Sequence, residues 1–181
     1  MHPITRIFKW SVLIGVLITL GCSRGNTGNP LPQEIQGLKL LKSTSGPEAA
    51  AMIARLHGKK VAPSENFIGH YGTGPNHIML YVSRFKSKDK AQNLLNSMSK
   101  HIGKGSSGFV HHLTFDVDGN TIHIVLGQGQ VNYFFRKGKN LYWLGIGADM
   151  ARSGLAQLLK VDVEKIPTLN SLLSNSPERK S

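Results

Sequence analysis

The chain has 181 residues, with 22 Lys and Arg against 10 Asp and Glu, a formal net charge of +12. An apolar content of 40% excludes an intrinsically disordered chain, and the length allows one domain with a hydrophobic core and terminal extensions. The single cysteine excludes an internal disulfide framework and any metal site built from several cysteines.

The first residues have the organisation of an export signal. Arg6 and Lys9 give residues 1–9 a positive charge, whereas residues 10–21 carry no charge and are mostly apolar. A membrane-spanning helix needs about 20 apolar residues, so this shorter segment is typical of a signal peptide, which we expect to cover residues 1–21. The alternative is an uncleaved anchor helix.

The only cysteine lies directly after this segment. Ile18-Thr19-Leu20-Gly21-Cys22 resembles the lipobox of bacterial lipoproteins. In that family the cysteine thiol receives a diacylglycerol, the signal is cut before the cysteine, and the new amine is often acylated as well. The resemblance implies that Cys22 is a lipidation site and that the bilayer is a partner. Because Ser23 is not the Asp that retains such proteins on the inner membrane, it implies the outer membrane, facing the periplasm, in a Gram-negative cell.

Composition divides the rest of the chain into three parts. Residues 22–34 are predicted to be the lipidated cysteine with a flexible tether rich in turn-forming residues, 35–173 a single α+β domain, and 174–181 a polar tail. Removal of the signal takes away two basic residues, and the remaining chain is still strongly basic. Export and the absence of interleaved basic and aromatic residues argue against nucleic acid as a partner, so the charge is expected to face solvent or anionic lipid.

Hydrophobic periodicity and capping residues indicate alternating strands and helices. Helices are expected over about 47–57, 88–102 and 149–160, with a helical turn over 166–173, and strands over about 66–72, 76–85, 109–117, 121–126, 131–136 and 141–147. The order predicts an α+β fold with an antiparallel sheet of about six strands and helices on one face.

A strand–strand–helix unit is expected to occur twice, because a shift of 64 residues aligns Leu80 with Leu144 and Leu94 with Leu158. The arrangement loosely resembles ferredoxin-like α+β domains. Residues 46–59 resemble the opening of uncharacterised bacterial exported proteins, a resemblance that implies no activity.

Histidines are the candidate metal ligands. Asp118-Gly119 is a strong hairpin signal, and pairing across it places His112 diagonal to His123. If Tyr71 pairs with Asn76, a second hairpin places His70 opposite His77.

Four imidazoles would then lie on the helix-free face of the sheet. Together with Asp116, they form a candidate site for Zn, Cu, Ni or haem iron. The alternative is a set of half-exposed polar residues without a ligand role. The candidate residues are His70, His77, His112, His123 and Asp116.

Aromatic residues crowd two neighbouring strands and suggest a partner surface. We expect Tyr133, Phe134, Tyr142 and Trp143 to form an apolar patch, since exposed patches of this kind mark contacts with another protein. The partner would be another envelope protein or a second copy of the chain.

No catalytic residues are predicted. The chain has no Gly-x-Ser-x-Gly elbow, no phosphate-binding loop and no close pair of carboxylates, and its one thiol would be acylated. The sequence therefore predicts a membrane-anchored lipoprotein whose exported domain is a non-catalytic binding or assembly module of the cell envelope, without a cofactor. The alternative is a metal- or haem-binding periplasmic domain.

Overall fold

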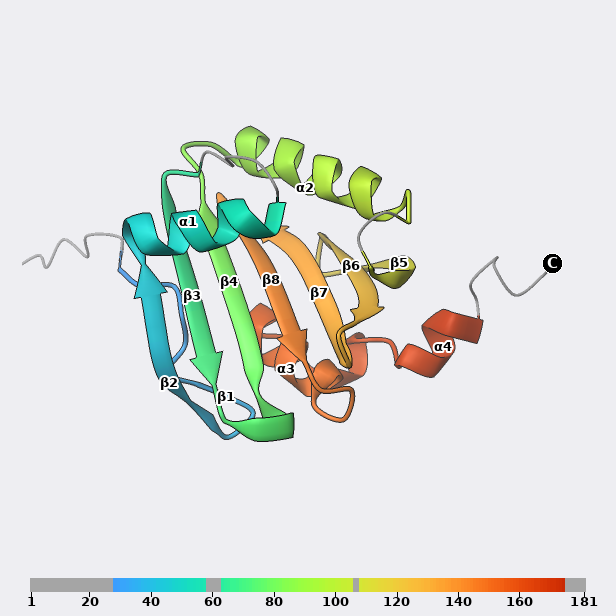
Figure 1. Ribbon diagram of the computed structural model, residues 1–181. Helices are drawn as coiled ribbons and strands as arrows, with labels where there is room; N and C mark the ends of the chain where they lie inside the picture. The colour runs from blue at the N-terminus through green and yellow to red at the C-terminus, as the bar shows by residue number, and fades with distance from the viewer. Residues whose placement is uncertain (1–27, 58–62, 106–107, 175–181) are drawn as a thin grey trace, which may run out of the picture.

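The fold is built on one antiparallel sheet. The computed structural model describes residues 28–57, 63–105 and 108–174, and it contains eight strands in the order β1-β2-β3-β4-β8-β7-β6-β5 (Figure 1). The strands are β1 (Glu34–Ile35), β2 (Leu38–Ser45), β3 (Glu65–Tyr71), β4 (Ile78–Arg84), β5 (Val110–Val117), β6 (Asn120–Gly127), β7 (Gln130–Lys137) and β8 (Asn140–Ile146). The helices are α1 (Gly46–His57), α2 (Lys88–Ile102), α3 (Ala151–Leu159) and α4 (Leu169–Ser174). The predicted α+β class and antiparallel sheet are confirmed.

The predicted number of strands was too low because β1 and β2 have weak sequence patterns. β1 has 2 residues, and β2 is a largely exposed strand in which Leu41 is 58% exposed. A strand is recognised in a sequence by alternating apolar and polar residues, and this alternation arises only where one face of the strand is buried. β2 is exposed over most of its length and therefore lacks it. Positive φ angles at Gln36 and Gly37 (50° and 76°) make the turn that pairs the two strands.

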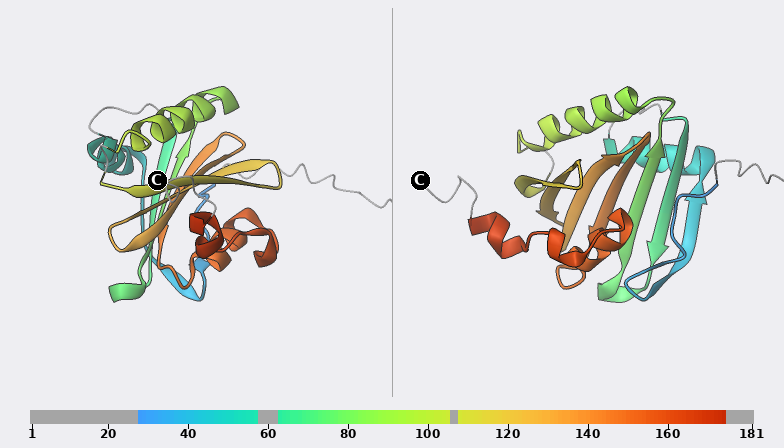
Figure 2. Two further views of the ribbon diagram at one scale, coloured as in Figure 1. Left: turned by 90° about the vertical axis from the view of Figure 1, so that its right-hand side faces the viewer. Right: turned by 180° about the vertical axis from the view of Figure 1, so that it is seen from behind.

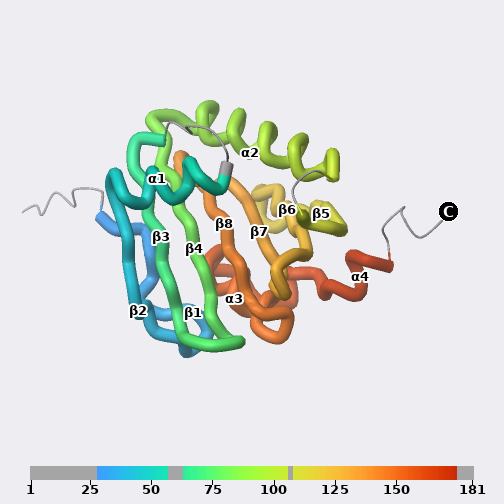
Figure 3. The backbone as a smooth tube through the Cα atoms, in the orientation of Figure 1, coloured from blue at the N-terminus to red at the C-terminus, as the bar shows by residue number. Residues whose placement is uncertain are grey.

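The chain crosses the sheet between β4 and β5. β4 lies in the interior of the sheet, whereas β5 forms its far edge, and α2 connects the two (Figure 3). From that edge β5, β6, β7 and β8 return as a meander, until β8 pairs with β4. In that pair Leu80 lies opposite Leu144, which are the two residues that the internal repeat aligns.

Helices cover both faces of the sheet, so the prediction that they share one face was wrong. Figure 2 shows α1 and α2 on one side of the strands, and α3 with α4 on the other. The central strands are apolar on both faces: Leu144 packs towards α3, whereas its neighbour Trp143 packs towards α2. Both apolar faces therefore have to be shielded from solvent by helices, and the described sheet has no helix-free face.

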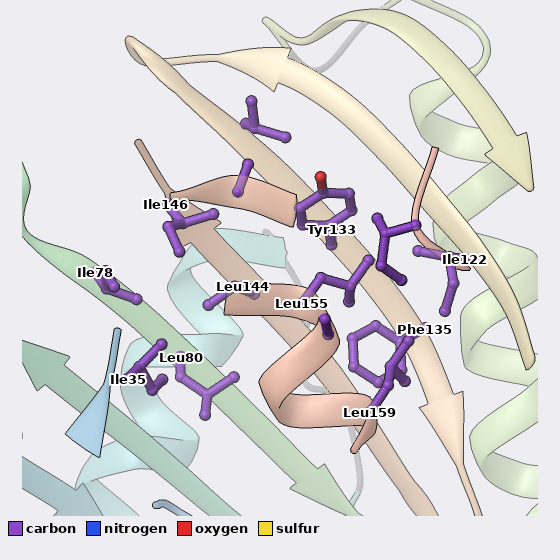
Figure 4. Packing of buried hydrophobic residues seen from close by; sticks show 14 of the residues in the cluster. Ile35, Ile78, Leu80, Ile122, Tyr133, Phe135, Leu144, Ile146, Leu155 and Leu159 are labelled. Carbon is purple, nitrogen blue, oxygen red and sulfur yellow. The ribbon is translucent and has the colours of Figure 1, made fainter. Parts of the chain in front are cut away.

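The larger core lies between the sheet and α3. Side chains from alternate positions of β4, β6, β7 and β8 meet Leu155 and Leu159 of α3, all nearly inaccessible to solvent (Figure 4). Gly154 lets the helix approach closely, because a Cβ at this position would lie 2.5 Å from Cδ1 of Ile146.

Both predicted strand–strand–helix units exist, but their arrangements differ. They are β3-β4-α2 and β7-β8-α3. Their strands lie in one sheet, whereas α2 and α3 pack on opposite faces of it. With eight strands and helices on both sides, the detail differs from the expected ferredoxin-like arrangement.

The described N-terminal residues are part of the domain. Leu31 is buried in the core, and the Tyr71 hydroxyl donates a hydrogen bond of 2.9 Å to the carbonyl oxygen of Pro32. The Arg84 guanidinium donates another, of 3.1 Å, to the carbonyl of Gly28. Gly28, Leu31 and Pro32, which fall within the segment 22–34 that the sequence assigns to a tether, thus contact the domain.

The predicted signal, Cys22 and nearly all of the polar tail lie outside the described residues. Within the described part of the chain, no helix has the length and apolar character needed to cross a bilayer.

Candidate functional site

A groove of about 680 Å³ lies on the sheet face that carries α1 and α2. Its lining comes from both helices, from β4, β7 and β8, and from the chain before β5. The volume falls within the roughly 300–1,000 Å³ that is typical of small-molecule sites. Its apolar lining residues include Ile53, Leu56, Met79, Leu94, Met98, Phe109 and Trp143.

The groove exists because the two helices pack on different parts of the sheet. Ala49 and Ile53 of α1 pack against Ile68 of β3. The apolar stripe of α2, predicted from its spacing, instead packs against β6, β7 and β8, with Phe134 and Leu141 among its contacts. Neither helix fills the space above β4 and β8, and this space between the two helices is the groove.

Polar side chains are held in place on the groove floor. Trp143 Nε1 donates a hydrogen bond of 3.1 Å to Asn132 Oδ1, and Asn132 Nδ2 donates to the carbonyls of Gly127 and Gln130, both at 3.3 Å. Gln130 Nε2 donates to the carbonyl of His77 at 3.0 Å. Asn132 is 5% exposed, so these partners satisfy a buried amide.

A row of rings connects the groove to a histidine pair. Phe109 lies 5.3 Å from Trp143, which stacks on Phe134 at 5.2 Å, and Phe134 stacks on His123 at 4.7 Å, all between ring centroids. His112 follows, with its Nε2 atom 3.1 Å from Nδ1 of His123. Phe134 thus lies between the groove-lining Trp143 and the histidine pair.

The strand pairing that brings these histidines together follows the expected register as far as Leu113, and a β-bulge between Val110 and Leu113 then shifts it. Val117 pairs with Asn120 across the turn and Thr114 pairs with His123, as expected from Asp118-Gly119. Asp118 and Gly119 both have positive φ (46° and 73°), which this turn requires.

Burial and mutual repulsion disfavour protons on the pair. Burial, followed by the charge of His112, lowers the pKa of His123 from 6.5 to about 4. Burial also lowers the pKa of His112. The two rings are thus held neutral in the folded protein near neutral pH.

The other predicted ligands lie elsewhere. Tyr71 pairs with Ile78 rather than Asn76, because residues 74–76 form a 3-10 turn that lengthens the hairpin loop. His70 therefore lies opposite Met79. Burial lowers the pKa of His70, and the charges of Lys42 and His77 lower it further.

The remaining two candidates make local contacts. His77 lies 3.0 Å from the Gly74 carbonyl through its Nδ1 atom, and Asp116 accepts a hydrogen bond of 2.7 Å from Thr121. Among the described residues, no three or more His, Cys, Asp or Glu side chains gather closely enough to hold a metal ion. Of the five predicted ligands, only His112 and His123 are in contact.

The predicted partner surface is largely buried. Tyr133 and Phe134 are 3% and 0% exposed, because α3 covers one face and α2 the other, so neither is available to a partner. Tyr142 and Trp143 are half-buried and border the groove. The patch expected from the strand aromatics is therefore divided between two cores and a groove wall.

Sequence reasoning did not identify the groove itself. Its walls combine residues far apart in the chain, such as Leu56, Leu94 and Gln130. Three of the predicted site residues, His77, Tyr142 and Trp143, do line the groove, but no sequence pattern connects them with the helix residues that complete its walls.

No family model, curated protein or solved structure matches the chain. The geometry and chemistry of the groove are therefore the basis for a functional assignment.

Proposed function

We propose that the chain is a membrane-anchored lipoprotein whose exported domain is a non-catalytic binding module of the cell envelope, and that the groove is its ligand site. The observation that carries this proposal is a groove of about 680 Å³ with apolar walls and a polar floor. Concave, mainly apolar sites with a few fixed polar groups are typical of small-molecule binding.

The contacts of the floor suit binding rather than chemistry. Asn132, Gln130 and Trp143 are hydrogen-bonded to one another or to the backbone. Ser83 Oγ likewise donates a hydrogen bond of 2.9 Å to Asn66 Oδ1. Side chains held in this way present a rigid, pre-organised surface, which reduces the entropy that binding costs.

The metal- or haem-binding alternative receives less support. His112 and His123 supply two nitrogen atoms, whereas structural zinc sites use four protein ligands and catalytic zinc sites three. The short N···N contact between the two rings also gives one nitrogen of each ring a hydrogen-bond partner.

The membrane anchor is tested by acyl labelling of the full-length chain in a bacterial host. We expect labelled palmitate in the wild type and in Ser23→Ala, and none in Cys22→Ser, because only the thiol of Cys22 can form the thioether. Equal labelling of wild type and Cys22→Ser would overturn the anchor.

The ligand groove is tested through Trp143, one of 2 tryptophans in the chain. The full-length protein is labelled with 5-fluorotryptophan, placed in lipid nanodiscs and titrated with N-phenyl-1-naphthylamine, a neutral apolar probe. We expect a saturable change in the ¹⁹F shift of Trp143, whose signal is assigned by its loss in Trp143→Phe.

Two positions on α2 provide a matched pair of variants. Ser97 and Asn93 are both exposed, but only Ser97 lines the groove. Ser97→Phe fills the groove and is expected to weaken probe binding at least tenfold, whereas Asn93→Phe leaves it unchanged. Equal binding by the two variants would contradict the proposed site.

A further inference from the structure

The part of the groove lining that the structure describes has no carboxylate, ammonium or guanidinium group. None of these lining residues is Asp, Glu, Lys or Arg, although the chain has 22 Lys and Arg and 10 Asp and Glu. A charged group that leaves water for a mainly apolar site is strongly disfavoured unless a group of opposite charge receives it. The lining therefore favours an uncharged occupant.

Hydrogen bonds fix the orientation of two amides on the groove floor. A carbonyl oxygen only accepts hydrogen bonds, so the Gln130 atom that lies 3.0 Å from the His77 carbonyl is the amide nitrogen. The Asn132 nitrogen is fixed in the same way by the carbonyls of Gly127 and Gln130. The other atom of each amide, Gln130 Oε1 and Asn132 Oδ1, is therefore an acceptor.

Both acceptor oxygens lie over the bare backbone of Gly145. A Cβ at this position would be 2.8 Å from Gln130 Oε1 and 3.2 Å from Asn132 Oδ1. Asn132 Oδ1 accepts the hydrogen bond of Trp143 and has a second lone pair, whereas no donor among the described residues contacts Gln130 Oε1. The glycine thus leaves space at a point where two acceptors converge and a donor can still be added.

The groove extends from this acceptor pair over an aromatic floor. Leu141, four residues before Gly145 on β8, also lines the groove. At about 3.3 Å per residue, the two positions are about 13 Å apart along the strand. Tyr81 and Trp143, which pair across β4 and β8, lie between them. An extended apolar molecule can therefore lie along β8 with its polar end at Gly145.

We infer that the ligand of the groove is an uncharged, mainly apolar molecule whose polar end is a hydrogen-bond donor, of which a long-chain alcohol is the simplest example. This inference rests on the proposed function. The hydroxyl group donates to Gln130 Oε1, with Asn132 Oδ1 beside it, and the apolar body packs on Trp143 and Leu94. A site built from acceptors discriminates against a ligand that has no donor, because the ligand's own oxygen then faces these acceptors unpaired.

Four ligands with similar tails and different polar ends test the inference. They are 1-decanol, its isostere nonyl methyl ether, which has no donor, and the ions decanoate and decylammonium. Each is titrated into the full-length, 5-fluorotryptophan-labelled protein in phosphatidylcholine nanodiscs, and the ¹⁹F shift of Trp143 reports binding. Empty nanodiscs give the correction for partition into lipid. We expect decanol to bind at least fivefold more tightly than the ether and at least tenfold more tightly than either ion.

Two variants locate the source of the discrimination. Gln130→Met has a side chain of similar length without an acceptor oxygen, and it should bring the affinities of decanol and the ether within twofold of each other. Asn93→Met removes an exposed amide outside the groove and should keep the wild-type preference for decanol. The melting temperature of each variant verifies its fold.

Three results would overturn the inference: a preference for decanol over the ether below fivefold, an unchanged preference in Gln130→Met, or an ion that binds as tightly as decanol. If the naphthylamine probe still shifts Trp143 in any of these cases, the proposed binding function stands and only the ligand class is wrong. If neither the probe nor decanol shifts Trp143, both proposals fall.

Discussion

Replacing Phe134 with alanine is expected to lower the free energy of unfolding by about 3–5 kcal/mol. The ring is 0% exposed, stacks between His123 and Trp143, and packs in the cluster that holds α2 on the sheet. Its removal leaves a cavity that these fixed neighbours can fill only in part. Urea unfolding of wild type and variant, followed by circular dichroism, measures the difference.

Leu155 provides the control, because it is equally buried but lies on α3, on the other face of the sheet. Leu155→Ala should lower the free energy of unfolding by a comparable amount and leave binding of the naphthylamine probe unchanged. Phe134→Ala should also weaken that binding, since Phe134 supports Trp143 at the groove wall. If Phe134→Ala lowered the free energy of unfolding by less than about 1 kcal/mol, the proposed role of Phe134 in the core would be contradicted.

Acidification from pH 7 to pH 4 is expected to destabilise the domain through His123. Its pKa is lowered from 6.5 to about 4 in the folded state, so the unfolded chain binds more protons between these values. The stability that the neutral ring contributes is complete above pH 6.5 and falls as the pH drops towards 4. At about 1.4 kcal/mol per pKa unit, the loss of stability is limited to about 3.5 kcal/mol. Urea unfolding at intervals between pH 7 and pH 4 measures it.

A variant without the titrating ring separates this effect from general acid denaturation. His123→Phe keeps an aromatic ring against Phe134 and should flatten the dependence below pH 6.5. His101→Gln, at an exposed position, should retain the wild-type dependence. Identical pH profiles for wild type and His123→Phe would show that another group controls the acid transition.

Local signals in the sequence predicted local structure well. The Asp118-Gly119 turn set the pairing of β5 with β6 as far as Leu113, because turn conformation and side-chain alternation together leave one register there. The β-bulge between Val110 and Leu113 had no such signal. The apolar residues at helical spacing in α2, among them Ala91, Leu95 and Met98, predict a buried face, and this face contacts the sheet. The hairpin between β3 and β4 was predicted two residues out of register, because the 3-10 turn after Gly72 had no comparable signal.

Features that depend on contacts between distant residues could not be predicted in the same way. The apolar stripes of α2 and α3 indicate buried faces, but they do not say which side of the sheet each helix covers. The side on which each helix packs determines whether Tyr133 and Phe134 are exposed or buried. The groove has the same origin, since Leu56 and Leu94 become neighbours of one cavity only after both helices have packed.

The two helices beside the groove take part in hydrophobic clusters of unequal size. The cluster of α1 has three buried residues, Ala49, Ile53 and Ile68. The cluster of α2 has eight and shares no buried residue with the first. Because buried apolar area contributes to the cost of lifting a helix, we expect a wide occupant of the groove to displace α1 before α2. The row of rings beside α2 then keeps its packing.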